Sequence, residues 1–293
     1  MFHHFYNERH SKAQGALSGD DFEKMLHYVG IDSILTPEEY TYKFLNNKLL
    51  ENEFCLTFDD GLLCQYDIAF PVLEKYNLKA FWFVYSSVFE GQQEKLEIYR
   101  IFRTEYFDGI DYFCNSLIKH LSNTSYYDLV MHRLDNFDSQ NYLKSFPFYN
   151  EADKKFRFIR DEILGPESYC EVMDSLMLAY NVDLNVLCSK LWMKNEHLKT
   201  LSKAGHAIGL HSYSHPTRFN MFSFKHQKEE YVKNLEHIYE VTGFKPFSMS
   251  HPCNSYNEDT IKILSNLDVK IGFCSNIFNI GNSVYEIPRE DHS

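Results

Sequence analysis

Glu53–Gly61 reads EFCLTFDDG, and a second stretch, Lys79–Tyr85, reads KAFWFVY. Both are short, mostly apolar runs of the kind that form buried strands, and we expect the first strand over Glu53–Phe58, with a turn at the Asp-Asp-Gly that follows. Between the two runs, Tyr66–Tyr76 has apolar residues at helical spacing. The order strand, helix, strand predicts a β-α-β unit, and therefore a parallel sheet with right-handed crossovers.

The same alternation returns in the C-terminal part of the chain. Apolar runs predict strands over 206–210, 247–250 and 270–275, and helical spacing predicts helices over 198–204, 224–242 and 257–267. Because β-α units repeat, we expect an α/β fold, either a barrel or a doubly wound sheet. In a barrel, the chemistry lies at the carboxyl ends of the strands.

The segment between these two parts, residues 90–195, is polar, rich in Tyr and Phe, and helical in its periodicity. After a stop at Gly165-Pro166, one apolar face is formed by residues 169, 172, 173, 176, 177 and 180. We expect a helical insertion within a single domain that spans residues 1–293. The length of this insertion suggests one of three roles: a lid, a substrate-selecting cap or an oligomer interface.

Composition limits the classes of partner and compartment. The 293 residues include 29 Lys and Arg against 41 Asp and Glu, a formal charge of −12, which counts against a nucleic-acid or membrane-surface protein. The sequence contains no run of about 18 apolar residues, so we expect no transmembrane segment. The first residues lack the apolar core of a secretory signal. The seven scattered cysteines include no CxxC pair, so we expect reduced thiols and a cytoplasmic protein.

Two motifs with candidate chemistry follow predicted strands. The first is Asp59-Asp60, and the second is the segment from His211 to His215, HSYSH. A His-x-x-x-His pair on one helical turn places both imidazoles on one face, and an Asp from another strand completes a two-His, one-carboxylate metal site. The second carboxylate is then free to take a proton from water. Taken singly, each motif also fits surface histidines or a solvated turn.

Taken with their flanking residues, the motifs resemble those of the polysaccharide deacetylases of the NodB-homology type, carbohydrate esterase family 4. The resemblance covers roughly Phe54–Ser87 and Leu198–Ser275. The motifs that show it are LTFDDG, LKTLSKAGHAIGLHSYSHP and GFKPFSMSHPCNSYNEDTIKIL. A weaker resemblance is present in the His-containing N-terminal segment. It implies a distorted (β/α) barrel that uses a divalent metal to remove N-acetyl, or other acyl, groups from amino sugars.

The resemblance also assigns roles by position. Asp59 corresponds to the general base of such enzymes, and the metal ligands correspond to Asp60, His211 and His215. Zinc is the first candidate for this set of N and O ligands, and cobalt, iron or nickel also fit it.

The third motif of the family departs from the usual pattern. It normally supplies an Arg that holds the base and a backbone N–H that faces the oxyanion, but here the matching residues are Ser250-His251-Pro252-Cys253-Asn254. Asn254 replaces a Gly, and Asn tolerates the left-handed conformation, so the Cys253 N–H remains the expected oxyanion donor. Family members that lack the Arg have a late Pro-Arg pair, which Pro288-Arg289 matches. Arg289 is thus a candidate tether for Asp59, unless it lies on a frayed terminus.

The general acid stays unassigned, because the late Leu-x-His motif that supplies it in the family is missing. His251, His292 and the pair His3-His4 are candidates, since a histidine near its usual pKa gives up a proton at neutral pH. Spacing favours none of them. His206 lies in the strand that precedes His211 and is interpreted as structural.

The densest basic cluster in this acidic chain is KKFRFIR, Lys154–Arg160. Two interpretations stay open. Its side chains bind a phosphate, for example the diphosphate of a nucleotide- or lipid-linked sugar, or they form a solvated helix face.

The leading hypothesis is a metal-dependent hydrolase that removes an N-acyl group, most simply acetyl, from an amino sugar of a cytoplasmic glycan precursor. A nucleotide- or lipid-linked sugar, as used in lipopolysaccharide or capsule biosynthesis, fits a protein without a secretory signal. The first alternative is a catalytically silent member that binds carbohydrate or a partner. The second is an Fe(II) oxygenase, which shares the two-His, one-carboxylate set.

Overall fold

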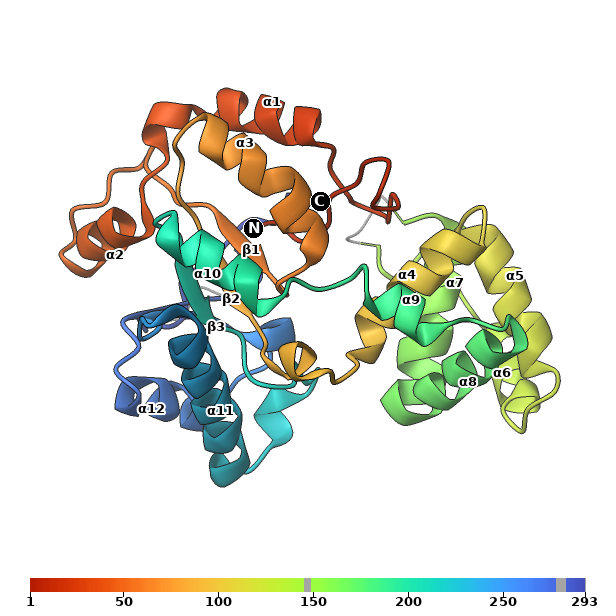
Figure 1. Ribbon diagram of the computed structural model, residues 1–293. Helices are drawn as coiled ribbons and strands as arrows, with labels where there is room; N and C mark the ends of the chain where they lie inside the picture. Colours follow the sequence, from red (N-terminus) through yellow and green to blue (C-terminus); the bar gives the residue numbers. More distant parts are fainter. Residues whose placement is uncertain (145–148, 278–282, 293) are drawn as a thin grey trace. The chain divides into compact units, whose positions relative to one another are not determined.

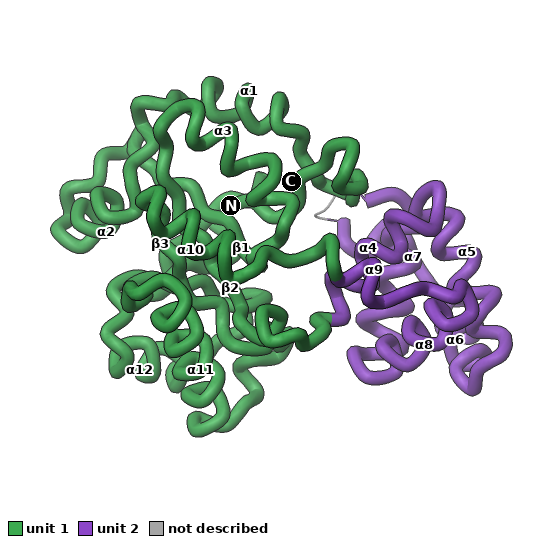
Figure 2. Tube along the Cα trace, in the orientation of Figure 1, with its two compact units in different colours: residues 1–94, 189–293 green, residues 95–188 purple. Residues whose placement is uncertain are grey.

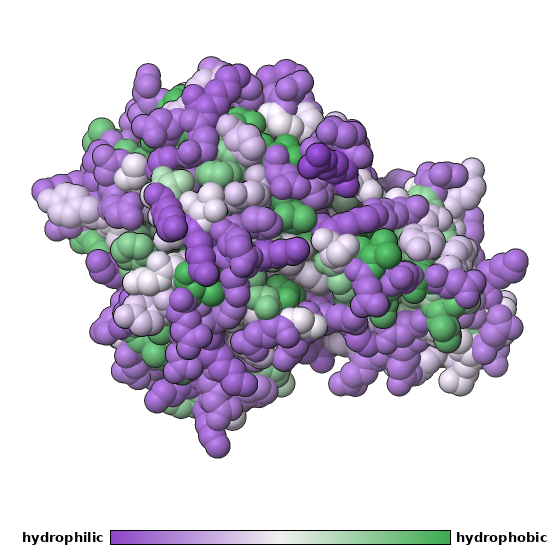
Figure 3. Space-filling view, in the orientation of Figure 1, coloured by the Kyte–Doolittle hydropathy of each residue, from purple (hydrophilic) through white to green (hydrophobic). Residues whose placement is uncertain are grey.

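The chain forms two compact units, which are distinguished in Figure 2. The computed structural model describes residues 1–144, 149–277 and 283–292. Unit 1 comprises residues 1–94 and 189–293 and contains the sheet; unit 2 comprises residues 95–188 and is helical (Figure 1). Hydrophilic side chains cover most of the face shown in Figure 3. No helix in the described ranges is long and apolar enough to span a bilayer.

Within the described residues, unit 1 holds one sheet of five parallel strands that lie side by side in chain order. The strands are β1 Thr57–Asp59, β2 Phe81–Val84, β3 Ala207–Leu210, β4 Ser248–Ser250 and β5 Ile271–Phe273. Each falls in or next to a predicted strand. The prediction for the first was wrong in its bounds, because Phe54 pairs with Ile34 outside the sheet and the strand continues through Asp59.

Both edges of the sheet are extended by the ends of the chain. Phe2 pairs in parallel with Phe58 of β1, and Ile287 pairs in parallel with Phe273 of β5. The two added segments also contact each other, because the Met1 amino group donates to the Glu290 carbonyl at 2.8 Å. The strands therefore curl into a distorted (β/α) barrel, which confirms the predicted fold class and excludes the doubly wound alternative.

Side chains alternate across the strands, as the pleat of a β-strand requires. The buried residues of one face form a core cluster: Tyr40, Phe81, Phe83, Ala207, Ile271, Phe273 and Ile287. On the other face of β1 and β2, Phe58 stacks on Trp82 with ring centroids 4.2 Å apart. Gly209 is required inside the barrel, because a Cβ there would lie 2.5 Å from the Phe83 ring.

Helices of unit 1 cover the sheet (Figure 1). They are α1 Gly19–Val29, α2 Pro37–Leu45, α3 Phe70–Lys75, α10 Asn195–Lys203, α11 Phe224–Thr242 and α12 Glu258–Asn266. The helix predicted over 224–242 has those bounds, and the one predicted over 257–267 begins one residue later because Asn257 caps it. The helix predicted over 66–76 is instead a π-helical turn, Gln65–Ala69, that continues into α3.

Unit 2 consists of helices packed on their apolar faces. They are α4 Lys95–Tyr106, α5 Ile110–Leu121, α6 Tyr127–Leu134, α7 Glu151–Phe158, the π-helix η4 Ile159–Leu164, α8 Gly165–Ala179 and α9 Leu184–Cys188. On α8 the predicted apolar residues are buried up to Met177, whereas Tyr180 is exposed beyond the helix end. The stop predicted at Gly165-Pro166 is confirmed, because η4 ends at Leu164 and Gly165 caps it with φ 70°. The pair begins α8, where a proline is tolerated because the first N–H groups need no partner within the helix.

Candidate metal centre and catalytic site

Asp59 and Asp60 lie at the carboxyl end of β1 and are both buried. Asp59 shares its face of the sheet with Phe83, its register partner in β2. Asp60 follows with φ 77°, in the left-handed region that a non-glycine residue seldom adopts. The sharp turn sends the two adjacent carboxylates in different directions.

Arg289 holds the Asp59 carboxylate through two hydrogen bonds. Its Nη1 donates to Oδ1 at 2.8 Å and its Nη2 to Oδ2 at 2.7 Å, a fork geometry that fixes the orientation of a carboxylate. The guanidinium is fixed in turn, because its Nε donates to the Cys274 carbonyl at 2.7 Å. Arg289 is 6% exposed, so the alternative of a frayed terminus does not hold for this side chain.

Ser250 completes the contacts of Asp59. Its hydroxyl accepts from Arg289 Nη2 at 2.6 Å and donates to Asp59 Oδ2 at 3.0 Å. Ser250 is the residue that replaces the Arg of the family motif. Sequence reasoning missed it, because the position was interpreted only as the loss of an Arg.

The pKa of Asp59 reflects these contacts. Burial by itself raises the pKa, but the charge and hydrogen bonds of Arg289 outweigh burial and lower it to about 2. Asp59 is therefore an ionised carboxylate at neutral pH.

His211 and His215 come from the loop that follows β3, and not from a helical turn as predicted. Ser212 and His215 have φ values of 62° and 54°, so the loop is a tight non-helical turn that brings the two rings together. His215 N–H donates to the Ser212 hydroxyl at 3.1 Å. The ring centroids of the two histidines are 4.8 Å apart.

Helix α11 holds this loop through two buried side chains, Glu230 and Asn234, which no sequence pattern singles out. Glu230 accepts from the backbone N–H groups of Tyr213 and Ser214 at 3.0 and 2.8 Å. Asn234 accepts from the His211 N–H at 2.9 Å and donates to the Val84 carbonyl at 2.9 Å. The loop is thus tied both to α11 and to the end of β2.

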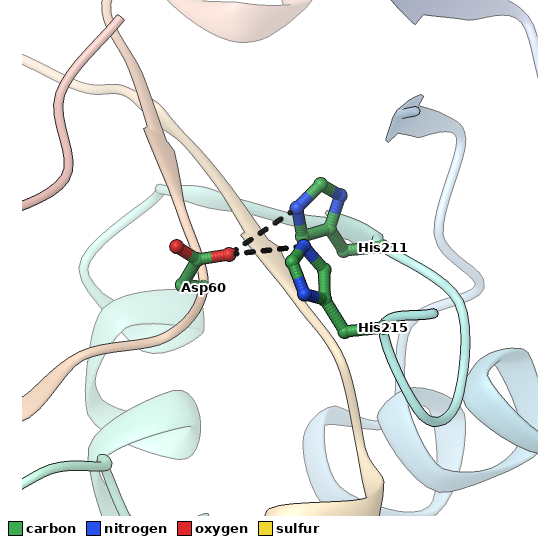
Figure 4. A group of neighbouring side chains, drawn as sticks. All are labelled: Asp60, His211 and His215. Atoms are coloured by element: carbon green, nitrogen blue, oxygen red, sulfur yellow. Dashed lines mark ion pairs between the residues drawn. The ribbon is translucent and has the colours of Figure 1, made fainter. Parts of the chain in front are cut away.

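The structure brings Asp60, His211 and His215 together as a group that is suited to hold a metal ion. Both imidazoles turn toward the same carboxylate oxygen (Figure 4). Nε2 of each lies 3.4 Å from Asp60 Oδ1. That oxygen is buried and has no hydrogen-bond partner among the described residues.

The ligating atoms of Asp60, His211 and His215 are suited to bind a metal ion. His211 Nδ1 faces the Ser250 carbonyl at 2.8 Å, and a carbonyl only accepts, so Nδ1 carries the hydrogen and Nε2 presents a lone pair to Asp60. Two acceptor atoms that face each other need a cation between them. Ligands about 2.0–2.2 Å from a tetrahedral metal lie roughly 3.4 Å apart, which matches both measured separations.

The loop after β4 carries the predicted oxyanion donor. Cys253 is exposed and has φ 50° and ψ 24°, and Asn254 also has a positive φ of 55°. The left-handed turn expected at Asn254 therefore includes Cys253 as well. The Asn254 side chain supports the turn by accepting from the Ser275 N–H at 3.1 Å.

The candidate acids occupy different environments. His251 is buried and its Nε2 donates to the Tyr285 carbonyl at 2.8 Å; burial lowers its pKa to about 3, so the ring stays neutral. His292 faces two carbonyls, those of Met1 and Gly15. Both rings therefore serve the structure.

His3 lies beside Asp59. The Phe2–Phe58 bridge sets the register, and the Gln65 side-chain amide donates to the carbonyls of both His3 and Asp59, at 2.8 and 2.6 Å. Burial lowers the pKa of His3, against the charges of Asp60 and Asp59, which raise it.

His206 is structural, as interpreted. Its Nδ1 accepts from the Ala80 N–H and from the Trp82 Nε1–H, both at 3.1 Å. These two donors require an unprotonated Nδ1.

A parallel α/β barrel with a two-His, one-carboxylate group at the carboxyl ends of its strands has the layout of a metal-dependent enzyme, and the ligand set alone fits both hydrolases and Fe(II) oxygenases. The polysaccharide deacetylase model matches residues 46–106 and 165–272, more than half of the chain, and the chain belongs to that family. The family is one of carbohydrate deacetylases that hydrolyse N-acetyl amide bonds. The matched ranges include the Asp, His and Cys253 positions of the site, whereas His3 and Arg289 lie outside them.

Solved structures of low sequence identity share the fold. The deacetylase PplD of Streptococcus pyogenes, solved in complex with acetate, is 15% identical with a TM-score of 0.54, over 94% of this chain and 82% of that one. IcaB from Ammonifex degensii is 14% identical with a TM-score of 0.52, over 98% and 88%. The BpsB deacetylase domain from Bordetella bronchiseptica is 13% identical with a TM-score of 0.52, over 98% and 92%. No curated protein sequence matches the chain significantly.

Proposed function

We propose that this deacetylase is metal-dependent and removes an N-acetyl group from an amino sugar carried on a nucleotide or lipid. The observation that carries the proposal is the buried Asp60 Oδ1, which lies 3.4 Å from Nε2 of His211 and of His215. A second carboxylate, that of Asp59, precedes Asp60 directly in the chain. A silent binding protein has no use for that second, separately held carboxylate.

Asp60, His211 and His215 would hold the ion, with zinc as the first candidate and cobalt, iron or nickel as others. A divalent ion at such a site lowers the pKa of water and polarises a carbonyl. The remaining steps depend on the side chains of this chain.

Asp59 acts as the general base. Arg289 and Ser250 keep its carboxylate ionised and fixed in direction, so it is able to accept the proton of an attacking water without rearrangement. The adjacent peptide link between Asp59 and Asp60 keeps the base beside the metal ligands.

The Cys253 N–H stabilises the oxyanion of the tetrahedral intermediate. Its left-handed backbone conformation follows the end of β4, at the same barrel end as Asp59. A backbone donor is independent of the side chain, so a cysteine at this position is compatible with this function.

His3 is the residue we propose as general acid. Residues paired in neighbouring parallel strands point to the same face of the sheet, so the register places the imidazole on the face of Asp59. There it is able to protonate the leaving amine.

The proposed compartment is the cytoplasm. All seven cysteines lie in the described residues and none of them forms a disulfide bond there, which is typical of a reducing compartment. A glycan precursor linked to a nucleotide or lipid is the substrate class available there.

The test combines metal analysis with acetate release from N-acetylated sugar nucleotides and lipid-linked sugars. The unaltered chain is expected to bind one metal and release acetate, Asp60→Ala to lose both, and Asp59→Asn to keep the metal while losing turnover. Activity retained by Asp59→Asn would refute the base assignment. Metal bound without acetate release from any member of the panel would favour a silent binding protein.

A further inference from the structure

Four arginines gather in unit 2, and they come from two separate parts of its sequence. Arg100 and Arg103 lie on α4, Arg157 on α7 and Arg160 on η4. Only Arg157 and Arg160 belong to the basic stretch singled out in the sequence. The fold adds the two arginines of α4, which no sequence pattern connects with them.

The Phe156 ring brings two of the guanidinium groups together, and Arg157, three residues before Arg160, lies over the Tyr149 ring at 4.0 Å. The guanidinium carbon of Arg103 lies 4.6 Å from the ring centroid of Phe156, and that of Arg160 lies 5.5 Å from the same centroid. Arg103 also lies over Phe113 at 5.6 Å. Arginine side chains stacked on aromatic rings are held in direction while their N–H groups stay available.

Ion pairs with carboxylates involve two of the four arginines, and the charges of Asp153 and Asp161 also act on Arg157. Arg100 pairs with Glu97 at 3.2 Å, and Arg160 pairs with Asp161 at 2.6 Å. In the described part of the chain no carboxylate forms an ion pair with Arg103 or Arg157, and Arg157 Nε is buried without a hydrogen-bond partner.

The pKa shifts of Arg103 and Tyr169 also reflect the positive charge of the neighbouring arginines. Burial and the charges of Arg100, Arg160 and Arg157 together lower the pKa of Arg103 to about 10. The buried hydroxyl of Tyr169 lies in the same field, because Arg103 and Arg160 both lower its pKa against the effect of burial. An excess of positive charge beside an available hydroxyl is unfavourable unless an anion joins it.

We propose that Arg103 and Arg157, supported by Arg160 and Tyr169, bind a phosphate or diphosphate group. Planar guanidinium groups bind phosphate oxygens through paired hydrogen bonds. Lys154, by contrast, donates to the Ser139 carbonyl and is not part of the site. This site lies within unit 2 and does not rest on the hydrolase function.

The test is isothermal titration of the full chain with pyrophosphate, uridine diphosphate and farnesyl diphosphate. We expect one site in unit 2 whose Kd rises at least tenfold in Arg103→Gln and in Arg157→Gln. Arg133→Gln is the matched control, because Arg133 also lies over a ring of unit 2, that of Phe158, but outside the cluster. Its Kd should not change, and circular dichroism checks that each variant is folded.

The three probes distinguish the sources of the phosphate group. Tightest binding of uridine diphosphate indicates a nucleotide carrier, tightest binding of farnesyl diphosphate a prenyl lipid, and equal affinities a site for the free anion. No binding of any probe, or equal binding by the Arg103→Gln and Arg133→Gln variants, would overturn the proposal. Both results are independent of acetate release, so they leave the proposed hydrolase function to its own test.

Discussion

Asp59 and Asp60 are adjacent in sequence but meet opposite kinds of partner. Asp59 faces a guanidinium that donates two hydrogen bonds, whereas Asp60 presents a buried oxygen to two imidazoles. Neighbouring titratable groups in different environments are how a site assigns different tasks to the same side chain. The left-handed turn at Asp60 is the feature that separates them.

Arg289→Met should raise the pKa of Asp59 from about 2, because the charge and hydrogen bonds of Arg289 are the largest effects that oppose burial. We expect the acidic limb of the pH profile of kcat/KM to move to higher pH. Loss of the fork should lower kcat about 100-fold by misplacing the base. Arg289→Lys keeps the positive charge but loses the paired hydrogen bonds of the guanidinium. Its pH profile should therefore lie closer to that of the unaltered protein than its kcat does.

Arg9→Met, a change of an exposed arginine in the same unit, is the control for Arg289→Met. An unchanged pH profile in Arg289→Met would contradict the assignment of Arg289 as the residue that holds Asp59.

His206 predicts a pH dependence of stability that is separate from catalysis. Burial lowers its pKa from 6.5 to about 4, so between these values the unfolded chain binds a proton that the folded chain does not. The contribution of His206 to the free energy of unfolding is therefore fully present above pH 6.5. It decreases as the pH falls toward 4, by about 3 kcal/mol in total. Urea unfolding at a series of pH values should show a smaller fall for His206→Gln; an equal fall in both proteins would exclude His206 as the cause.

Among the helices, α11 supports the loop that carries the two histidines of the candidate metal site. Glu230 holds two backbone N–H groups of the histidine loop, and Asn234 holds the N–H of His211 itself. Both side chains lie on one face of the helix, four residues apart, which is one turn.

Glu230→Gln should weaken metal binding by 10- to 100-fold, the usual cost of losing a residue that orients the ligands. Glu229→Gln is the matched control, because Glu229 is the exposed neighbour on the same helix and only pairs with Lys225 at 3.8 Å. Competition with a chromophoric chelator measures both affinities. Equal affinities in the two variants would show that the loop keeps its shape without Glu230.

The sequence predicted the order of strands and helices well because apolar runs and helical spacing are local properties. It placed Asp60, His211 and His215 at strand ends for the same reason. It predicted the wrong local structure for the histidines, since His-x-x-x-His spacing does not distinguish a helical turn from a left-handed loop. Ser250, Glu230 and Asn234 act through contacts between distant segments, which no local pattern contains.

In the molecule as a whole, the barrel and the helical unit each have buried apolar residues of their own, and the candidate metal site found among the described residues lies in the barrel. The two tryptophans, Trp82 and Trp192, both lie in unit 1. Trp192 Nε1 donates to the Tyr85 hydroxyl at 2.5 Å, and the Tyr85 ring stacks on His215 at 4.9 Å. Tryptophan fluorescence therefore reports on the barrel near its site.

Removal of the metal should destabilise the barrel. A free ion at 100 times its Kd stabilises the folded state by about 2.7 kcal/mol, so thermal unfolding followed by tryptophan fluorescence should shift to lower temperature in a chelator. His211→Ala should show no such shift, because it lacks a ligand. An equal shift in both proteins would indicate that the ion stabilises the chain at another position.

The closure of the barrel by both ends of the chain has a consequence for how the protein is made. Asp59 and Arg289 are 230 residues apart, and contacts of such long range form late and slowly. On a ribosome, Asp59 is synthesised 230 residues before Arg289, so a nascent chain that ends between them lacks the ion pair that the folded site contains. Such a chain leaves the Asp59 carboxylate without the side chain that fixes its direction.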